Sequence, residues 1–204
     1  MNPVSEFREI ILQYDLNKHP FYVAWREGTL PIEKLQRYAH DYGKFIASIP
    51  KAWETLSENR IANEERYHVS LWEEFRNAVD EKVGRRISFS SIPEMEELCM
   101  EAERCFKKPA ESLGALYAFE YQQPGTSKTK LEGLRKFYHL EENGEKYFEV
   151  HENDFAEPKL LEKRIKKLQN RDYLCAKIAC SRMSASIWRA LDGLMREEPA
   201  KIRV

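Results

Sequence analysis

Three segments of the sequence carry acidic side chains and histidines at spacings that can build one site. Glu64 and His68 are four residues apart, and His151 and Asp154 are three apart, so each pair shares one face of a helix. Glu120 lies between the two pairs in the sequence. Carboxylates and imidazoles presented by different helices of a bundle hold pairs of iron or manganese ions. The pattern therefore predicts a metal site inside a helical protein.

Glu120 continues an apolar stripe at helical spacing, so its carboxylate is expected to point into the protein. A buried carboxylate without a partner is costly, and a metal, a lysine or a histidine is expected beside it. Lys130 follows ten residues later, in register with further apolar residues, and also leans inward. The alternative is a core glutamate bonded to a hydroxyl or amide, with a lysine that extends to the surface.

The two histidines have a plainer interpretation as well. His68 and His151 can be core histidines held by hydrogen bonds, with Glu64 and Asp154 at the edge of the apolar stripe in water. A metal site and a purely structural cluster both remain open from spacing alone.

Apolar residues recur at helical spacing almost throughout the chain, and strand alternation is absent from the sequence pattern. Helices are expected at residues 4–16, 20–28, 32–59 with a bend before Pro50, 60–79, 93–106, 113–137 with an interruption at Pro124, and 146–168, and from about 170 to before Pro199. We predict a single domain over residues 1–204, an all-α bundle of about seven or eight helices.

The composition excludes several classes of protein. The 204 residues include 33 Lys and Arg against 34 Asp and Glu, which leaves no net field to favour nucleic acid or an anionic membrane. The apolar segments fall short of the ~18 residues that span a bilayer, and the N-terminus is acidic where a signal peptide is basic. The four cysteines form no C-x-x-C pair and are expected to be reduced. We expect a cytoplasmic protein that binds neither nucleic acid nor membrane.

Five motifs, in sequence order, resemble one known superfamily: KHPFYVAWREGTLPIEKLQRYAHDYGKFIASIPKAWETL, NEERYHVSLWEEF, YAFEYQQPGTSKTKLEGLRKFY, YFEVHENDFAE and SIWRALDGL. They are similar to the haem-oxygenase-like TenA/PqqC superfamily, and most of all to members of the type of the chlamydial protein associating with death domains (CADD). The likeness spans nearly the whole chain. It implies a compact all-α haem-oxygenase-like fold and a homodimer.

The resemblance also implies a chemistry. CADD-type members are non-haem dimetal oxygenases that make para-aminobenzoate, for folate synthesis, from one of their own tyrosines. They use two iron or manganese ions and molecular oxygen. Tyr22 corresponds to the consumed tyrosine, and Lys130 to the lysine that donates the amino group. Glu120, His68 and His151 fall on metal-ligand positions of the family.

Other family ligands do not carry over at their strict positions. The family has a glutamate seven residues before the first histidine, where this chain has Ile61 and offers Glu64 instead. Its later aspartate and histidine correspond to Phe155 and Pro158. Two nearby carboxylates could take these places, namely those of Asp154 and Glu157. The substitution gives two histidines and four carboxylates, a composition found in ferritin-like dimetal sites.

Two other functions fit the same fold. One is metal-free cofactor biosynthesis of the TenA or PqqC kind. Asp41, in the sequence HDY, matches the aspartate with which TenA enzymes bind a pyrimidine, and Tyr42 beside it completes the candidate ligand-binding pair. The nucleophilic cysteine of TenA thiaminases has no counterpart in 113–120. The other is a non-catalytic bundle that binds a partner or small ligand, against which the presence of both Tyr22 and Lys130 argues.

Overall fold

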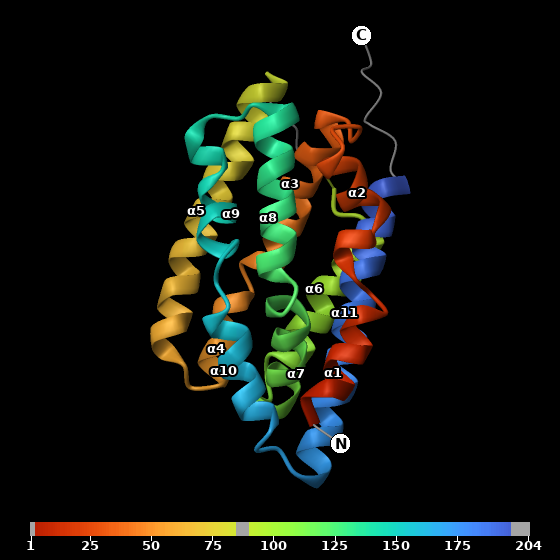
Figure 1. The fold of residues 1–204 in the computed structure, drawn as a ribbon, viewed down its shortest axis with the longest axis vertical. Coiled ribbons are helices and arrows are strands. Elements are labelled where there is room, and N and C mark those ends of the chain that lie inside the picture. Colours follow the sequence, from red (N-terminus) through yellow and green to blue (C-terminus); the bar gives the residue numbers. More distant parts are fainter. Residues whose placement is uncertain (1–2, 85–89, 197–204) are drawn as a thin grey trace.

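The computed structural model describes residues 3–84 and 90–196, and every regular element in these ranges is helical (Figure 1). The predicted all-α class is confirmed. The α-helices are α1 (Pro3–Leu12), α2 (Pro20–Arg26), α3 (Ile32–Ile46), α4 (Ile49–Thr55), α5 (Asn59–Val83), α6 (Pro93–Cys105), α7 (Pro109–Glu120), α8 (Gln123–Gly133), α9 (Lys146–His151), α10 (Ala156–Ile165) and α11 (Asn170–Arg196). Pro199, where the last helix is expected to stop, lies outside the described residues.

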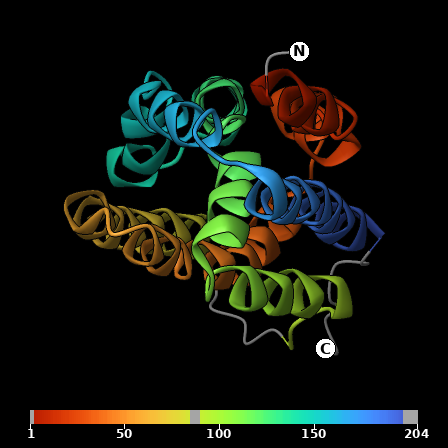
Figure 2. The same ribbon diagram turned by 90° about the horizontal axis from the view of Figure 1, so that it is seen from below.

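Helix α7 forms the centre of the bundle. All of its residues from Ser112 to Glu120 are buried, as expected for a helix that is apolar on every side. Figure 2 shows it surrounded by the other helices. It packs most extensively against α11, and a Cβ atom on Gly114 would lie only 1.8 Å from the carbonyl oxygen of Ala176. Glu120, the last residue of α7, is consequently placed deep inside the protein.

The structure divides the chain into more and shorter helices than the seven or eight expected. The stretch 32–59 separates into α3, α4 and the start of α5, 113–137 into α7 and α8, and 146–168 into α9 and α10. Prolines explain much of this, because proline is favoured in the first turn of a helix and disfavoured further inside. Pro50 and Pro124 lie in the first turns of α4 and α8.

Helix α2, which carries Tyr22, is anchored at its start by a buried histidine. His19 Nδ1 accepts the backbone N–H of Phe21 at 3.0 Å, and Nε2 lies 3.2 Å from Oδ1 of Asp192 on α11. Burial lowers the pKa of His19, so the ring is neutral, with its proton on Nε2 and donated to Asp192. This arrangement fixes α2 against α11.

Four further helices meet α2 around the interior that holds the candidate site. Helix α3 packs on α5, α5 on α9, α9 on α8, and α8 on α2 (Figure 1). No helix within residues 3–84 and 90–196 is long and apolar enough to cross a lipid bilayer.

Candidate metal and tyrosine site

Two histidines and a glutamate converge between α5 and α9. One ligand atom each from Glu65, His68 and His151 lies within 4.8 Å of the others. Nδ1 of His68 is 2.9 Å from Oε1 of Glu65, and the centroids of the His68 and His151 rings are 4.5 Å apart. Two imidazoles and one carboxylate are the donor set that holds non-haem iron(II) in many oxygenases. The three side chains can therefore bind a metal ion.

The structure corrects the prediction that Glu64 points inward. The Glu64 side chain is 49% exposed and pairs with Arg60 at 2.5 Å, whereas Glu65 is only 2% exposed. Each residue of a helix is turned by about 100° from the one before it, so a shift of one position decides which acid faces the interior. Glu65 also fits an alternating spacing of four and three residues with Ile61 and His68. That spacing was the sequence signal that could have identified it.

His151 is prepared to act as a ligand through Nε2. Its Nδ1 lies 2.5 Å from the carbonyl oxygen of Tyr147, which can only accept, so the ring proton is on Nδ1. Burial, together with the charge of His68, lowers the pKa of His151 to about 3. The imidazole is thus neutral, with the Nε2 lone pair available, and the hydrogen bond to the carbonyl holds the ring in that tautomer.

Two more buried carboxylates extend the triad. Glu120 is 2% exposed, which confirms its predicted inward orientation, and its Oε1 is buried without a hydrogen-bond partner among the described residues. Glu157, at the start of α10, is 6% exposed. Burial and then the charge of Glu65 raise the pKa of Glu157 to about 9. Burial and then the charge of Glu157 raise the pKa of Glu120 well above its usual range.

Buried carboxylates that raise one another's pKa must carry protons or share a cation. The orphaned oxygen of Glu120 and the raised pKa of both acids therefore fit a bound metal.

Residues 154–158, where the sequence departs from the family pattern, differ in what they contribute to the candidate metal site. Asp154 is half-buried, and its Oδ1 accepts the backbone N–H of Ala156, the first residue of α10, at 2.9 Å. Phe155 is 53% exposed, and Pro158 is buried in the first turn of α10. Glu157 is thus the residue of this segment whose carboxylate is buried beside the cluster, while the role of Asp154 as a ligand stays a prediction.

A cluster of buried tyrosines surrounds Lys130. The hydroxyl of Tyr22 is 3.0 Å from that of Tyr38, and the Tyr38 ring stacks on Tyr42 with centroids 4.9 Å apart. Nζ of Lys130 lies 4.4 Å from the centre of the Tyr22 ring and donates to the Tyr38 hydroxyl at 3.4 Å. The sequence reasoning singled out Tyr22, Tyr42 and Lys130 but missed Tyr38, which connects them.

Lys130 is buried without a carboxylate beside it in the part of the chain that the structure describes. Its ammonium group faces the rings of Tyr22, Trp25 and Phe148. Burial lowers the pKa of Lys130 to about 7, so a large share of the amine is neutral and nucleophilic at neutral pH. Burial raises the pKa of Tyr22 well above its usual range, which keeps that phenol protonated.

Tyr42 and Tyr147 connect the tyrosine cluster to the acidic cluster, which consists of Glu65, Glu120 and Glu157. Tyr42 lies close enough to both Tyr22 and Glu120 for their charges to add to the burial that raises the pKa of Tyr42. The ring of Tyr147 is 4.4 Å from that of His151, and its hydroxyl accepts from Gln123 at 2.7 Å. A set of buried side chains thus extends from the candidate metal ligands to Tyr22.

The comparisons with known proteins agree with this architecture. Residues 5–80 match the model of the TENA/THI-4/PQQC family. A TenA homologue from P. horikoshii OT3 superimposes with a TM-score of 0.75 at 14% identity, covering 96% of this chain and 99% of that one. A domain with a heme oxygenase-like fold from Shewanella denitrificans OS217 gives a TM-score of 0.75 at 15% identity, over 96% and 93% of the chains. The resemblance to the haem-oxygenase-like TenA/PqqC superfamily is confirmed.

Sequence relatives indicate which members of this superfamily the chain resembles. A protein of Nitrosomonas europaea named 4-aminobenzoate synthase is 28% identical over an alignment of 217 positions, which covers 91% of this chain and 87% of the relative. A protein of the same name from Chlamydia muridarum is 28% identical, with 98% and 92% covered. The predicted likeness to CADD-type proteins is confirmed, and the names of these relatives indicate an enzyme.

The structure places Asp41 and Tyr42, the candidate ligand-binding pair, in different surroundings. Asp41 is buried and neutralised by its own helix, since Nε of Arg37 lies 2.6 Å from its carboxylate and Nζ of Lys44 lies 3.5 Å away. Tyr42 belongs to the tyrosine cluster. A ligand-binding role for this pair stays a prediction.

Proposed function

We propose that the protein is a metal-dependent oxygenase that forms para-aminobenzoate from its own Tyr22, with Lys130 as the source of the amino group. The observation that carries this proposal is the buried amine of Lys130 over the ring of Tyr22 at 4.4 Å. Tyrosine already has a benzene ring with two substituents in para positions, as the product has. The relatives named 4-aminobenzoate synthase support the same product.

The residues that would hold the metal are Glu65, His68 and His151, with Glu120 and Glu157 as the carboxylates for a second ion. The CADD likeness favours two ions of iron or manganese, and molecular oxygen as the oxidant. When bound, the metal supplies oxygen activation and one-electron oxidation, which protein side chains lack.

The protein side chains prepare the tyrosine for that chemistry. The partly neutral amine of Lys130 supplies a nitrogen lone pair beside an aromatic ring. The Tyr38 hydroxyl lies within hydrogen-bond distance of both Tyr22 and Lys130, so it can take or return a proton at either. The surrounding aromatic rings exclude water, which keeps the amine from being fully protonated.

The test follows the atoms of the product. Protein loaded with iron or manganese and given oxygen and a reductant should release para-aminobenzoate, and peptide mass spectrometry should show loss of mass at Tyr22. Lysine labelled with ¹⁵N should transfer its label to the product. Lys130→Arg should abolish the label, whereas Lys128→Arg, an exposed neighbour on α8, should not.

The controls separate this proposal from its alternatives. Product whose nitrogen is unlabelled, or an intact Tyr22 after turnover, would contradict self-sacrifice. Turnover of an added aromatic substrate by protein that elemental analysis shows to be free of metal would favour the metal-free chemistry of TenA and PqqC relatives.

A further inference from the structure

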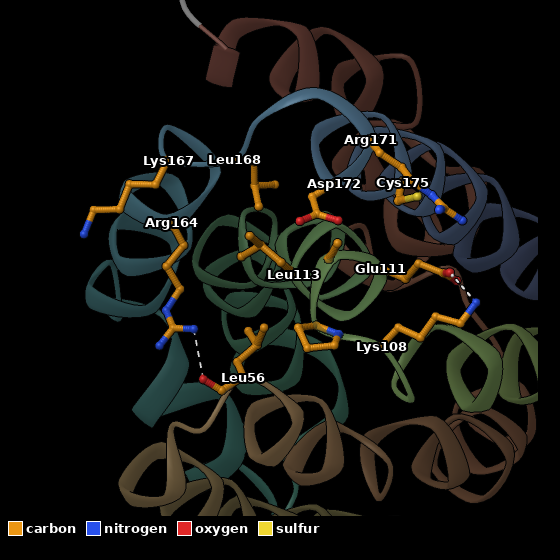
Figure 3. Close-up of a pocket in the computed structure, with 12 residues that line it drawn as sticks. Leu56, Lys108, Glu111, Leu113, Arg164, Lys167, Leu168, Arg171, Asp172 and Cys175 are labelled. Carbon is orange, nitrogen blue, oxygen red and sulfur yellow. Dashed lines mark hydrogen bonds and ion pairs between the residues drawn. The ribbon is translucent and has the colours of Figure 1, made fainter.

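A concave pocket lies at the end of the bundle where α7 and α11 begin and α10 ends (Figure 3). Its volume is about 810 Å³, within the range of small-molecule sites. None of the residues that line it belongs to the metal and tyrosine site. Whatever it binds is therefore separate from the reaction proposed above.

The inner surface of this pocket is apolar. Leu56, Leu113 and Leu168 contribute to its wall (Figure 3). Pro109 also lines the pocket. Leu113 is almost fully buried and Leu168 half-buried, so the wall is part of the folded core. An apolar surface of this kind gains free energy when a ligand covers it.

The rim of the pocket carries an excess of positive charge. Four cations and two acids line it: Lys108, Arg164, Lys167, Arg171, Glu111 and Asp172. Glu111 is already bonded to two cations, Arg104 at 2.5 Å and Lys108 at 3.0 Å. Arg164 pairs with Glu58, whereas Lys167 and Arg171, on opposite sides of the pocket in Figure 3, make no ion pair with any described residue. Asp172 offsets only one of their two charges.

The helix arrangement adds to this field. Both α7 and α11 start at the pocket, and the N-terminal end of each helix dipole is positive. Lys108, which precedes α7, provides no side-chain cap for its first N–H groups. The cavity therefore combines an apolar wall with a positive rim.

We propose that this pocket binds an organic anion with an apolar body, a carboxylate or a phosphate ester. The charged group is met by Lys167 and Arg171, whose long side chains can swing over the opening. The apolar body covers Pro109 and Leu168, the more exposed apolar residues of the wall. This site is independent of the proposed oxygenase activity and of its metal.

Cys175 supplies a direct readout, because it lines the pocket and is half-buried. The alkylation rate of Cys175 by iodoacetamide is measured by mass spectrometry, with half-buried Cys99 on α6 as the internal control. The probes are 4-phenylbutyrate and phenyl phosphate, compared with neutral 4-phenylbutanol and with inorganic phosphate. Either organic anion should slow alkylation of Cys175 about fivefold at several times its Kd, without affecting Cys99.

Charge reversal then locates the binding site. The double variant Lys167→Glu, Arg171→Glu should raise the Kd at least about tenfold, which is roughly 1.4 kcal/mol. Lys163→Glu, an exposed change on α10 outside the pocket, should leave it within about twofold. All three positions are exposed, so the fold should be retained.

Four outcomes would overturn the proposal. They are equal protection by 4-phenylbutanol, equal protection by inorganic phosphate, no protection by any probe at millimolar concentration, and protection that survives the double charge reversal.

Discussion

The acidic cluster and the tyrosine cluster solve the same physical problem in opposite ways. Glu120, Glu157 and Lys130 are buried and make no ion pair with any residue that the structure describes, yet the first cluster gathers several carboxylates and the second isolates a single amine. In the first, burial and mutual repulsion raise the pKa of Glu157 to about 9. In the second, burial alone lowers the pKa of Lys130 to about 7.

The separation of the two clusters has a chemical consequence. If Glu120 lay beside Lys130, the two would form an ion pair, and the amine would stay protonated. Tyr42 and Tyr147 instead stand near the carboxylates, while aromatic rings surround the amine. The acids are thereby left for a cation from outside, and Lys130 is left with a lone pair.

The largest expected effect distinguishes two adjacent glutamates. Glu65→Gln should weaken iron or manganese binding at least about 10- to 100-fold, because it removes one of three converging ligands. Glu64→Gln, at an exposed position paired with Arg60, should bind metal like the unaltered protein. Equilibrium dialysis with elemental analysis measures both. If Glu64→Gln lost the metal instead, the assignment of ligands on α5 would be wrong.

Lys130→Met should abolish para-aminobenzoate formation and at the same time stabilise the protein. Lys130 has a folded pKa below its unfolded value, so the unfolded state binds more protons between about pH 7 and 10.5. Burial of Lys130 therefore destabilises the folded protein fully below pH 7, and this destabilisation decreases as the pH rises towards 10.5. The variant should gain roughly 1–3 kcal/mol at pH 7 and little at pH 10.5.

Urea denaturation across this pH range tests the change at Lys130. Lys128→Met, at an exposed position of the same helix, serves as the control and should be nearly neutral. A loss of stability on replacing Lys130 at pH 7 would show that its contacts with the rings outweigh its burial.

Glu157→Gln should act in opposite directions with and without metal. The folded pKa of Glu157 is raised, so its charge destabilises the metal-free protein increasingly as the pH rises from about 4.5 to 9. The variant should be more stable by roughly 1–2 kcal/mol at pH 8 and unchanged below pH 4.5. With metal added, it should gain less stability than the unaltered protein. Thermal unfolding at both pH values, with and without iron, gives the comparison.

Tyr38→Phe should have the smallest effect. It removes the hydroxyl between Tyr22 and Lys130 but keeps the ring contacts, so the loss of stability should be about 0.5–1.5 kcal/mol. Formation of para-aminobenzoate should slow about tenfold or more, because the proton path at Tyr22 is lost. Single-turnover product assays measure the rate. An unchanged rate would restrict Tyr38 to a packing role.

Some features of the site could be predicted because they depend on local periodicity. An apolar run that ends in Glu120 forces that carboxylate inward wherever α7 is packed, and Lys130 follows the same rule on α8. The choice between Glu64 and Glu65 is different. The two residues are turned by about 100° from each other on α5, and which one faces the interior depends on how α5 is rotated against its neighbours.

The sequence by itself determined the helical class, the superfamily resemblance and the inward placement of Glu120, Lys130 and both histidines, since spacing along one helix suffices for each. Only the tertiary structure decided that Tyr38 bridges Tyr22 to Lys130, that Glu157 is buried more deeply beside the acids than Asp154, and that a positive pocket forms at the far end of α7. These depend on contacts between different helices. Such contacts are set by packing angles and helix rotation, for which a single sequence carries no periodic signal.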